Sequence, residues 1–126
     1  MTNSEDNKFP PITNAVALKL YQHIANEWGI SAEQSRTIFS FLEDKQFEDW
    51  MSGNLNSVQP DLLVFVSHLM AIYKLLHQIF PDPVQANAWM SKPSNEFKYL
   101  NRLELITQKG IKGAQEIKNH LESQFN

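Results

Sequence analysis

The side chains that could bind a metal ion are spread along the chain rather than gathered in a motif. The histidines are His23, His68, His77 and His120, and no two of them are four residues apart. His68 and His77 fall in one expected helix, on similar faces but about two and a half turns apart. Two ligands at that separation do not reach one metal ion, so the spacing predicts no metal site.

Covalent catalysis and phosphate binding also lack the residues they need. The chain has no cysteine, which excludes disulfides, zinc–thiolate sites and cysteine nucleophiles. It has four glycines, and the pair Gly110 and Gly113 is more typical of a break between helices than of a phosphate loop. The carboxylates fall at expected helix caps or on solvated helix faces. We therefore expect no enzyme, no catalytic residue and no cofactor.

Composition predicts one globular domain or two small lobes that share a core. The chain has 126 residues, of which 42% are hydrophobic, and this suffices for a core. The longest apolar run, Leu62–Val66, is shorter than the ~20 residues of a membrane-spanning helix. Residues 1–11 lack the basic and then apolar pattern of a signal peptide. We expect a cytoplasmic protein without a membrane partner.

Apolar residues recur at helical spacing, and no strand pattern with a period of two occurs. We expect an all-α, compact multi-helix bundle. Its expected parts are a tail over residues 1–11, a helix-turn-helix-like lobe with a long central helix over 12–80, and a C-terminal lobe over 81–126. Capping boxes predict helix starts at Ser31 and Asn101, and Phe41 is expected on a buried face. Gly110 and Gly113 are expected to separate the last two helices.

The stretch from Ile72 to Pro93 predicts a corner between two helices. Pro81 ends the long helix, because its ring disfavours the helical conformation at the preceding residue. Asp82 is a natural N-cap, and Pro83 suits the first helical position. Gln85 would complete a capping box. Trp89 then follows on the next helix.

This stretch resembles the hinge of the MbcA/ParS/Xre antitoxins, bacterial proteins that neutralise RES-domain toxins. The matching segments are Tyr73-Lys74-Leu75-Leu76, Phe80-Pro81-Asp82-Pro83, Ala88-Trp89 and Pro93-Ser94-Asn95. The resemblance covers the chain from about Ile12 onward. It implies an antitoxin of a type II toxin–antitoxin system that occludes the active site of a NAD-degrading toxin, with autoregulation of its operon as a further role. It also makes a homodimer a hypothesis, because the family's complexes are built around antitoxin dimers.

In this family the region after Trp89 binds the toxin. The resemblance and the preference of interfaces for Tyr, Phe and Arg give the predicted toxin-binding residues Phe97, Lys98, Tyr99, Asn101, Arg102 and Lys118. Phe97, Tyr99 and Arg102 are expected to protrude near a turn, although Phe97 and Tyr99 would also suit a place capping the bundle. Lys98-Tyr99 stands where family members commonly have Gly-Gly, so the loop shape, the toxin contacts or both differ here.

The helices after Gly29 resemble the family's helix-turn-helix, whose second helix would be Asp44–Met51. The residues available to contact DNA are Gln34, Lys45, Gln46 and Asn54. Residues 43–54 carry four acids and one base, and phosphates repel such a helix. The alternative function, a stand-alone helix-turn-helix DNA-binding transcriptional regulator, is therefore less favoured than an antitoxin, and we expect no DNA binding by the protein alone.

Overall fold

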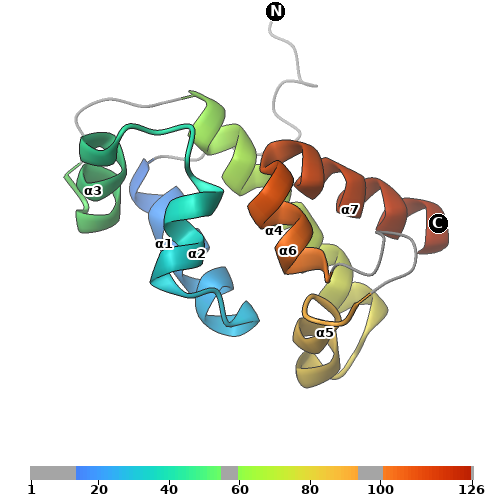
Figure 1. The fold of residues 1–126 in the computed structure, drawn as a ribbon. Helices are drawn as coiled ribbons and strands as arrows, with labels where there is room; N and C mark the ends of the chain where they lie inside the picture. The colour runs from blue at the N-terminus through green and yellow to red at the C-terminus, as the bar shows by residue number, and fades with distance from the viewer. Residues whose placement is uncertain (1–13, 55–59, 94–100, 126) are drawn as a thin grey trace, which may run out of the picture.

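The computed structural model describes residues 14–54, 60–93 and 101–125, and within these ranges it contains seven α-helices and no β-strand (Figure 1). The predicted all-α class is confirmed. The predicted tail over residues 1–11 lies outside the described residues. The helices are α1 (Asn14–Trp28), α2 (Ala32–Ile38), α3 (Asp44–Ser52), α4 (Pro60–Ile79), α5 (Pro83–Trp89), α6 (Arg102–Lys109) and α7 (Ile111–Phe125).

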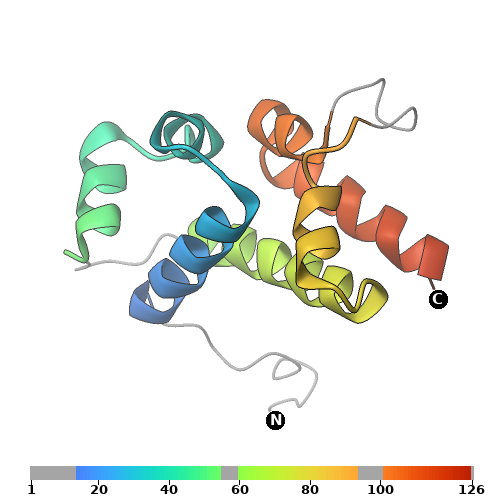
Figure 2. The ribbon, with the colours of Figure 1, turned by 90° about the horizontal axis from the view of Figure 1, so that it is seen from below.

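The long helix α4 runs through the middle of the bundle. Helix α3 lies toward one end of the molecule and α5 and α7 lie toward the other, while α2 packs against α6 between them (Figures 1 and 2). α4 packs against α1, α5 and α7. Its core residues are Leu62, Phe65, Val66, Leu69, Ile72 and Leu76. By length and composition alone α4 is long and apolar enough to cross a membrane. The sequence expectation of no membrane-spanning helix rested on the short uninterrupted apolar run Leu62–Val66, which is only part of α4. The burial of these residues against other helices gives α4 a role as the core helix.

Local capping sets most of the helix starts. The predicted box at Ser31 is confirmed, since Ser31 Oγ accepts from the Gln34 N–H and Gln34 Oε1 accepts from the Ser31 N–H. The predicted box at Asn101 is also confirmed, with Glu104 as the reciprocal partner. These bonds satisfy backbone N–H groups that the first turn of a helix leaves without intrahelical partners.

Three sequence expectations are wrong at helix ends. Asp82 is the N-cap of α5 as expected, but its carboxylate accepts from the Val84 N–H at 3.0 Å and forms no box with Gln85, because an N-cap side chain can satisfy either the second or the third N–H of the helix. Phe41 is 48% exposed, because α2 ends at Ile38 and the chain turns before α3. Gly113 does not separate α6 from α7 but lies in the first turn of α7, and Gly110 alone makes the break, at a φ of +60°.

An aromatic cluster holds α1, α2 and α3 on the first half of α4. Phe39 lies at its centre, with ring centroids 4.8 Å from Tyr21, 5.0 Å from Trp50 and 5.3 Å from Phe65, all in edge-to-face geometry. The Tyr21 hydroxyl lies 2.6 Å from Ser35 Oγ, so its polar end is paired inside the cluster. Such ring pairs add to the stability from apolar burial.

Candidate functional site

The junction between α5 and α6 is the part of the described chain that lies next to the predicted toxin-binding residues. Arg102, the first residue of α6, places its guanidinium 3.8 Å from the centroid of the Trp89 ring. Its Nη1 donates to the carbonyls of Trp89 at 3.1 Å and Lys92 at 2.8 Å. Only 7% of Arg102 is exposed. The expectation that Arg102 protrudes is therefore wrong, because ring stacking and the carbonyls at the end of α5 draw the cation inward.

The backbone on either side of this junction is paired. Pro93 and Asn101 form an isolated antiparallel bridge, and the Leu103 N–H donates to the Met90 carbonyl at 3.1 Å. The Asn101 side chain caps α6 by accepting from the Glu104 N–H at 2.7 Å. These contacts hold the two ends of segment 94–100 beside each other. The predicted residues Phe97, Lys98 and Tyr99 belong to that segment and lie outside the described residues.

Lys118 belongs to a different contact. It is half-buried on α7, whose inner face packs against α4. Burial, and then the positive charge of Lys118, lower the pKa of His68 on α4 below its ordinary value. The structure therefore brings Asn101 and Arg102 together at the start of α6, whereas Lys118 lies on α7, where its positive charge disfavours the protonated form of His68 on α4.

A polar network that the sequence did not reveal joins α1, α4 and α5. Glu27 Oε1 accepts from the Tyr73 hydroxyl at 3.3 Å and from Asn87 Nδ2 at 3.2 Å. His23 Nε2 lies 3.1 Å from the same hydroxyl. Burial and the nearby Glu27 raise the pKa of Tyr73. These partners are separated by 46 and 60 residues in the chain, and only Tyr73 carried a sequence signal, as part of the segment that resembles the antitoxin hinge.

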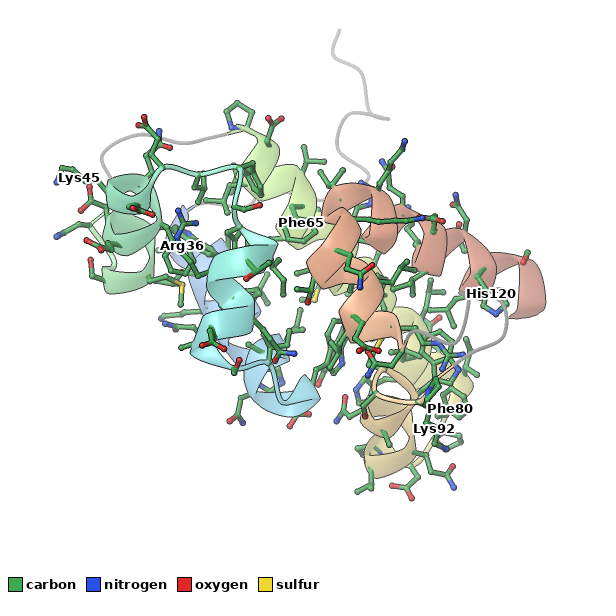
Figure 3. The ribbon with its side chains drawn as sticks, viewed as in Figure 1. Arg36, Lys45, Phe65, Phe80, Lys92 and His120 are labelled. Atoms are coloured by element: carbon green, nitrogen blue, oxygen red, sulfur yellow. The ribbon has the colours of Figure 1, made fainter. Side chains whose placement is uncertain are left out.

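The predicted DNA-contacting residues are mostly engaged within their own helices. The side-chain oxygens of Gln34 and Gln46 accept from the backbone N–H groups of Ser31 and Glu43, both at 2.9 Å. Lys45 Nζ lies 3.5 Å from Asp49 on the exposed face of α3. Figure 3 shows Lys45 at the outer side of α3, far from Lys92. Asn54 is exposed just after α3.

Arg36, which the sequence had not singled out, is also engaged. Its Nη1 donates to the Phe39 carbonyl at 3.0 Å, and its Nη2 donates to the Leu42 carbonyl at 3.1 Å and to Asp44 Oδ1 at 2.6 Å. The guanidinium carbon lies 5.0 Å from the centroid of the Phe47 ring. Arg36 thus holds the turn between α2 and α3, and its charge is compensated there.

Two surface hollows lie near the connection between α6 and α7. A cleft of about 460 Å³ lies between the end of α2 and the α6–α7 connection, where Phe41, Asp61, Lys109 and Ile111 contribute to its lining. Another, of about 490 Å³, lies along α7 and is lined by Lys109, Lys112, Gln115, Glu116 and Asn119. Among residues 14–54, 60–93 and 101–125, no group of three His, Asp or Glu side chains is placed to hold a metal ion.

Comparison with known proteins finds a similarity that extends over most of the chain. The chain is similar to uncharacterized protein y4oB of Sinorhizobium fredii (strain NBRC 101917 / NGR234), at 22% identity over 107 residues, which covers 85% of this chain and 82% of that protein. The similarity thus extends across most of both chains. No family model matches the sequence, and no solved structure matches it.

Proposed function

We propose that this chain is an antitoxin that binds a RES-domain toxin and occludes its NAD-degrading active site in the cytoplasm. The observation that carries the proposal is the role of the segments that resemble the MbcA/ParS/Xre hinge. Tyr73 contacts Glu27 on α1, Asp82 and Pro83 begin α5 after the corner, and Trp89 stacks on Arg102. These three segments thus take part in the packing of α1 and α4, in the start of α5 and in the junction of α5 with α6, which supports the proposal.

Inhibition of this kind needs shape and contact area rather than chemistry. The region from Phe97 onward has five basic and three acidic residues and includes the aromatic side chains favoured at interfaces. A protein surface seated over the toxin's cleft would exclude NAD sterically. The antitoxin would need no cofactor for this action.

The charge around α3 supports an antitoxin over a stand-alone DNA-binding regulator. Glu43, Asp44 and Glu48 are exposed, and the nearby cations Arg36 and Lys45 pair with carboxylates of the same lobe. A helix with this charge would lose Coulomb energy on approach to phosphates. Operon autoregulation would therefore depend on charge or symmetry contributed by the bound toxin or by a second antitoxin copy.

Co-expression tests the proposal directly. The chain is produced with the product of the adjacent gene, which the proposal expects to be a RES-domain protein, one of the two carrying an affinity tag, and growth, cellular NAD and co-purification are measured. We expect a stable complex, restored growth and preserved NAD. A neighbouring RES-domain protein that depletes NAD equally with and without this chain, and that does not co-purify with it, would refute the proposal. Light scattering on the free chain would test the homodimer hypothesis in the same preparation.

A further inference from the structure

The cleft of about 460 Å³ lies where the end of α2, the start of α4 and the connection between α6 and α7 meet. Helices α2 and α6 lie side by side there (Figures 1 and 2). Its lining includes Ile38, Phe41, Asp61 and residues 107–111. Pockets that hold small ligands measure about 300–1,000 Å³, so the cleft has room for one long side chain of a partner.

The charge of the cleft lining favours a cation. Asp61 is exposed in the first turn of α4 and has no hydrogen-bond or ion-pair partner among the residues that the structure describes. The helix dipole favours an acid at this position, but both carboxylate oxygens stay able to accept from a ligand. Lys109 also lines the cleft, yet its Nζ lies 3.3 Å from Glu116 on α7, which compensates its charge. These three side chains together leave one negative charge uncompensated.

The C-terminal end of α6 adds carbonyl groups of the same polarity. The last four carbonyls of an α-helix lack partners within the helix. Gly110 turns the chain at a φ of +60°, and its N–H donates to the Ile106 carbonyl at 2.7 Å. Within the described ranges the carbonyls of residues 107–109, which line the cleft, receive no such bond from the residues after the turn. The partial negative charge at a helix C-terminus also favours a cation.

Phe41 supplies an aromatic ring that is held in place. Its centroid lies 6.0 Å from that of Phe39 and 6.2 Å from that of Phe65. The aromatic cluster therefore fixes the ring from one side, while 48% of Phe41 stays exposed. A cation placed over an accessible aromatic ring is attracted by the ring's quadrupole.

The chain itself shows which side chain such a set of groups binds. Arg36 lies over the Phe47 ring at 5.0 Å and donates to Asp44 and to turn carbonyls. Arg102 lies over the Trp89 ring at 3.8 Å and donates to carbonyls at the end of α5. The cleft offers the same kinds of group, a ring, a carboxylate and helix-end carbonyls. Both arginines of the chain are engaged elsewhere, so neither occupies it.

We propose that this cleft binds an arginine side chain of a partner protein, with the guanidinium stacked on Phe41 and hydrogen-bonded to Asp61. A planar guanidinium can stack on a ring and donate to oxygens at its edge at the same time, and arginine is among the residues that anchor interfaces. The partner is a different protein rather than a second copy, because this chain has no arginine to offer. The site does not depend on which protein supplies the arginine, so it stands apart from the antitoxin proposal.

Peptide titrations of the full chain test the site. The ¹⁵N-labelled protein is titrated at constant ionic strength with acetyl-Gly-Arg-Gly-amide, and in parallel with the peptide in which citrulline, the uncharged analogue, replaces arginine. We expect the arginine peptide to shift the amide resonances of Phe41, Asp61 and Gly110 saturably at millimolar concentration, and the citrulline peptide to give no saturable shift. The corresponding lysine peptide should bind about threefold more weakly, because an ammonium group does not stack as a guanidinium does.

Variants with matched controls locate the binding. Asp61→Asn should weaken the arginine peptide about fivefold, which is the upper end for an exposed charge pair, and Phe41→Ala about threefold. Glu48→Gln removes an exposed carboxylate of α3 outside the cleft, and Val84→Ala shortens an apolar side chain of α5 that is 75% exposed. Both controls should bind like the wild type. Circular dichroism would verify the fold of each variant.

Four results would overturn the proposal. Equal binding of the arginine and citrulline peptides would show that charge has no part in it, and equal binding of the lysine peptide would remove the role of the planar guanidinium. Shifts that do not saturate, or that miss the cleft residues, would place the peptide elsewhere. Asp61→Asn that binds like the wild type, or like an equally weakened Glu48→Gln, would exclude a specific contact with Asp61. The antitoxin proposal would stand unchanged in each case.

Discussion

Replacing Gly113 by alanine should destabilise the protein, although alanine is the better helix former. A Cβ at Gly113 would lie 2.5 Å from the Leu105 carbonyl oxygen, 3.0 Å from its carbon and 3.2 Å from Ile106 Cα. All three are backbone atoms of α6, so no side-chain rotation relieves the overlap and the two helices must move apart. Overpacking of this kind costs about 1–3 kcal/mol, against a helix-propensity gain of up to about 1 kcal/mol.

With an overpacking cost near the middle of that range, about 2 kcal/mol, the net loss should be about 1 kcal/mol in the free energy of unfolding, or a fall in Tm of roughly 3–5 °C for a chain of this size. Urea and thermal unfolding followed by circular dichroism would measure it. Lys112→Ala, an exposed change in the same turn of α7, is the matched control and should stay within about 0.5 kcal/mol of the wild type. A Gly113→Ala protein as stable as the wild type, or more stable, would refute the close approach of α6 and α7.

Three further predictions concern protonation and charge. Burial raises the pKa of Tyr21 to about 12, so the stability that this neutral phenol contributes is present below pH 10 and is lost as the pH rises through 10 toward 12. The free energy of unfolding, measured with urea between pH 9 and 11.5, should therefore fall less steeply with pH in Tyr21→Phe than in the wild type. Equal slopes for the two proteins would contradict this. The pKa of His68 is lowered by burial and then by Lys118, so stability should fall as the pH drops below about 6.5. NMR titration should show the pKa of His68 rising in Lys118→Gln but not in Lys112→Gln, whose altered residue is exposed, and identical curves would exclude the Lys118 contribution. Finally, the protein alone should give no mobility shift of the DNA upstream of its gene, and a salt-sensitive shift would overturn our interpretation of α3.

Local signals in the sequence predicted the fold better than they predicted the candidate site. The caps at Ser31 and Asn101 join residues three apart, so the pattern that predicts them is contained in one turn of helix. The link from Glu27 to Tyr73 and Asn87 joins residues 46 and 60 apart, and no local pattern encodes such a pairing. It became visible only once α1, α4 and α5 were packed together.

Arg102 and Gly113 show why residue type alone gave a wrong exposure for the first and a wrong position relative to the helices for the second. Arginine is enriched at interfaces, and this favoured an exposed Arg102, but the same planar cation also suits an aromatic ring and the carbonyls at a helix end. Glycine is common at helix breaks, and this favoured Gly113 as a separator, but glycine equally permits close backbone approach. In both cases the neighbours in space decided between two ordinary uses of the residue.

The contacts of Arg36 and Arg102 also determine how the protein should respond to chemical modification. The chain has only two arginines, Arg36 and Arg102, and its other basic residues apart from histidine are lysines. Both guanidinium groups are occupied with backbone carbonyls and aromatic rings. Amine-directed reagents should therefore remove most of the accessible positive charge, whereas arginine-directed dicarbonyl reagents should modify Arg102, which is 7% exposed, more slowly than Arg36, whose side chain is 35% exposed. The rate of labelling at Arg102 would thus report on local opening of the junction between α5 and α6.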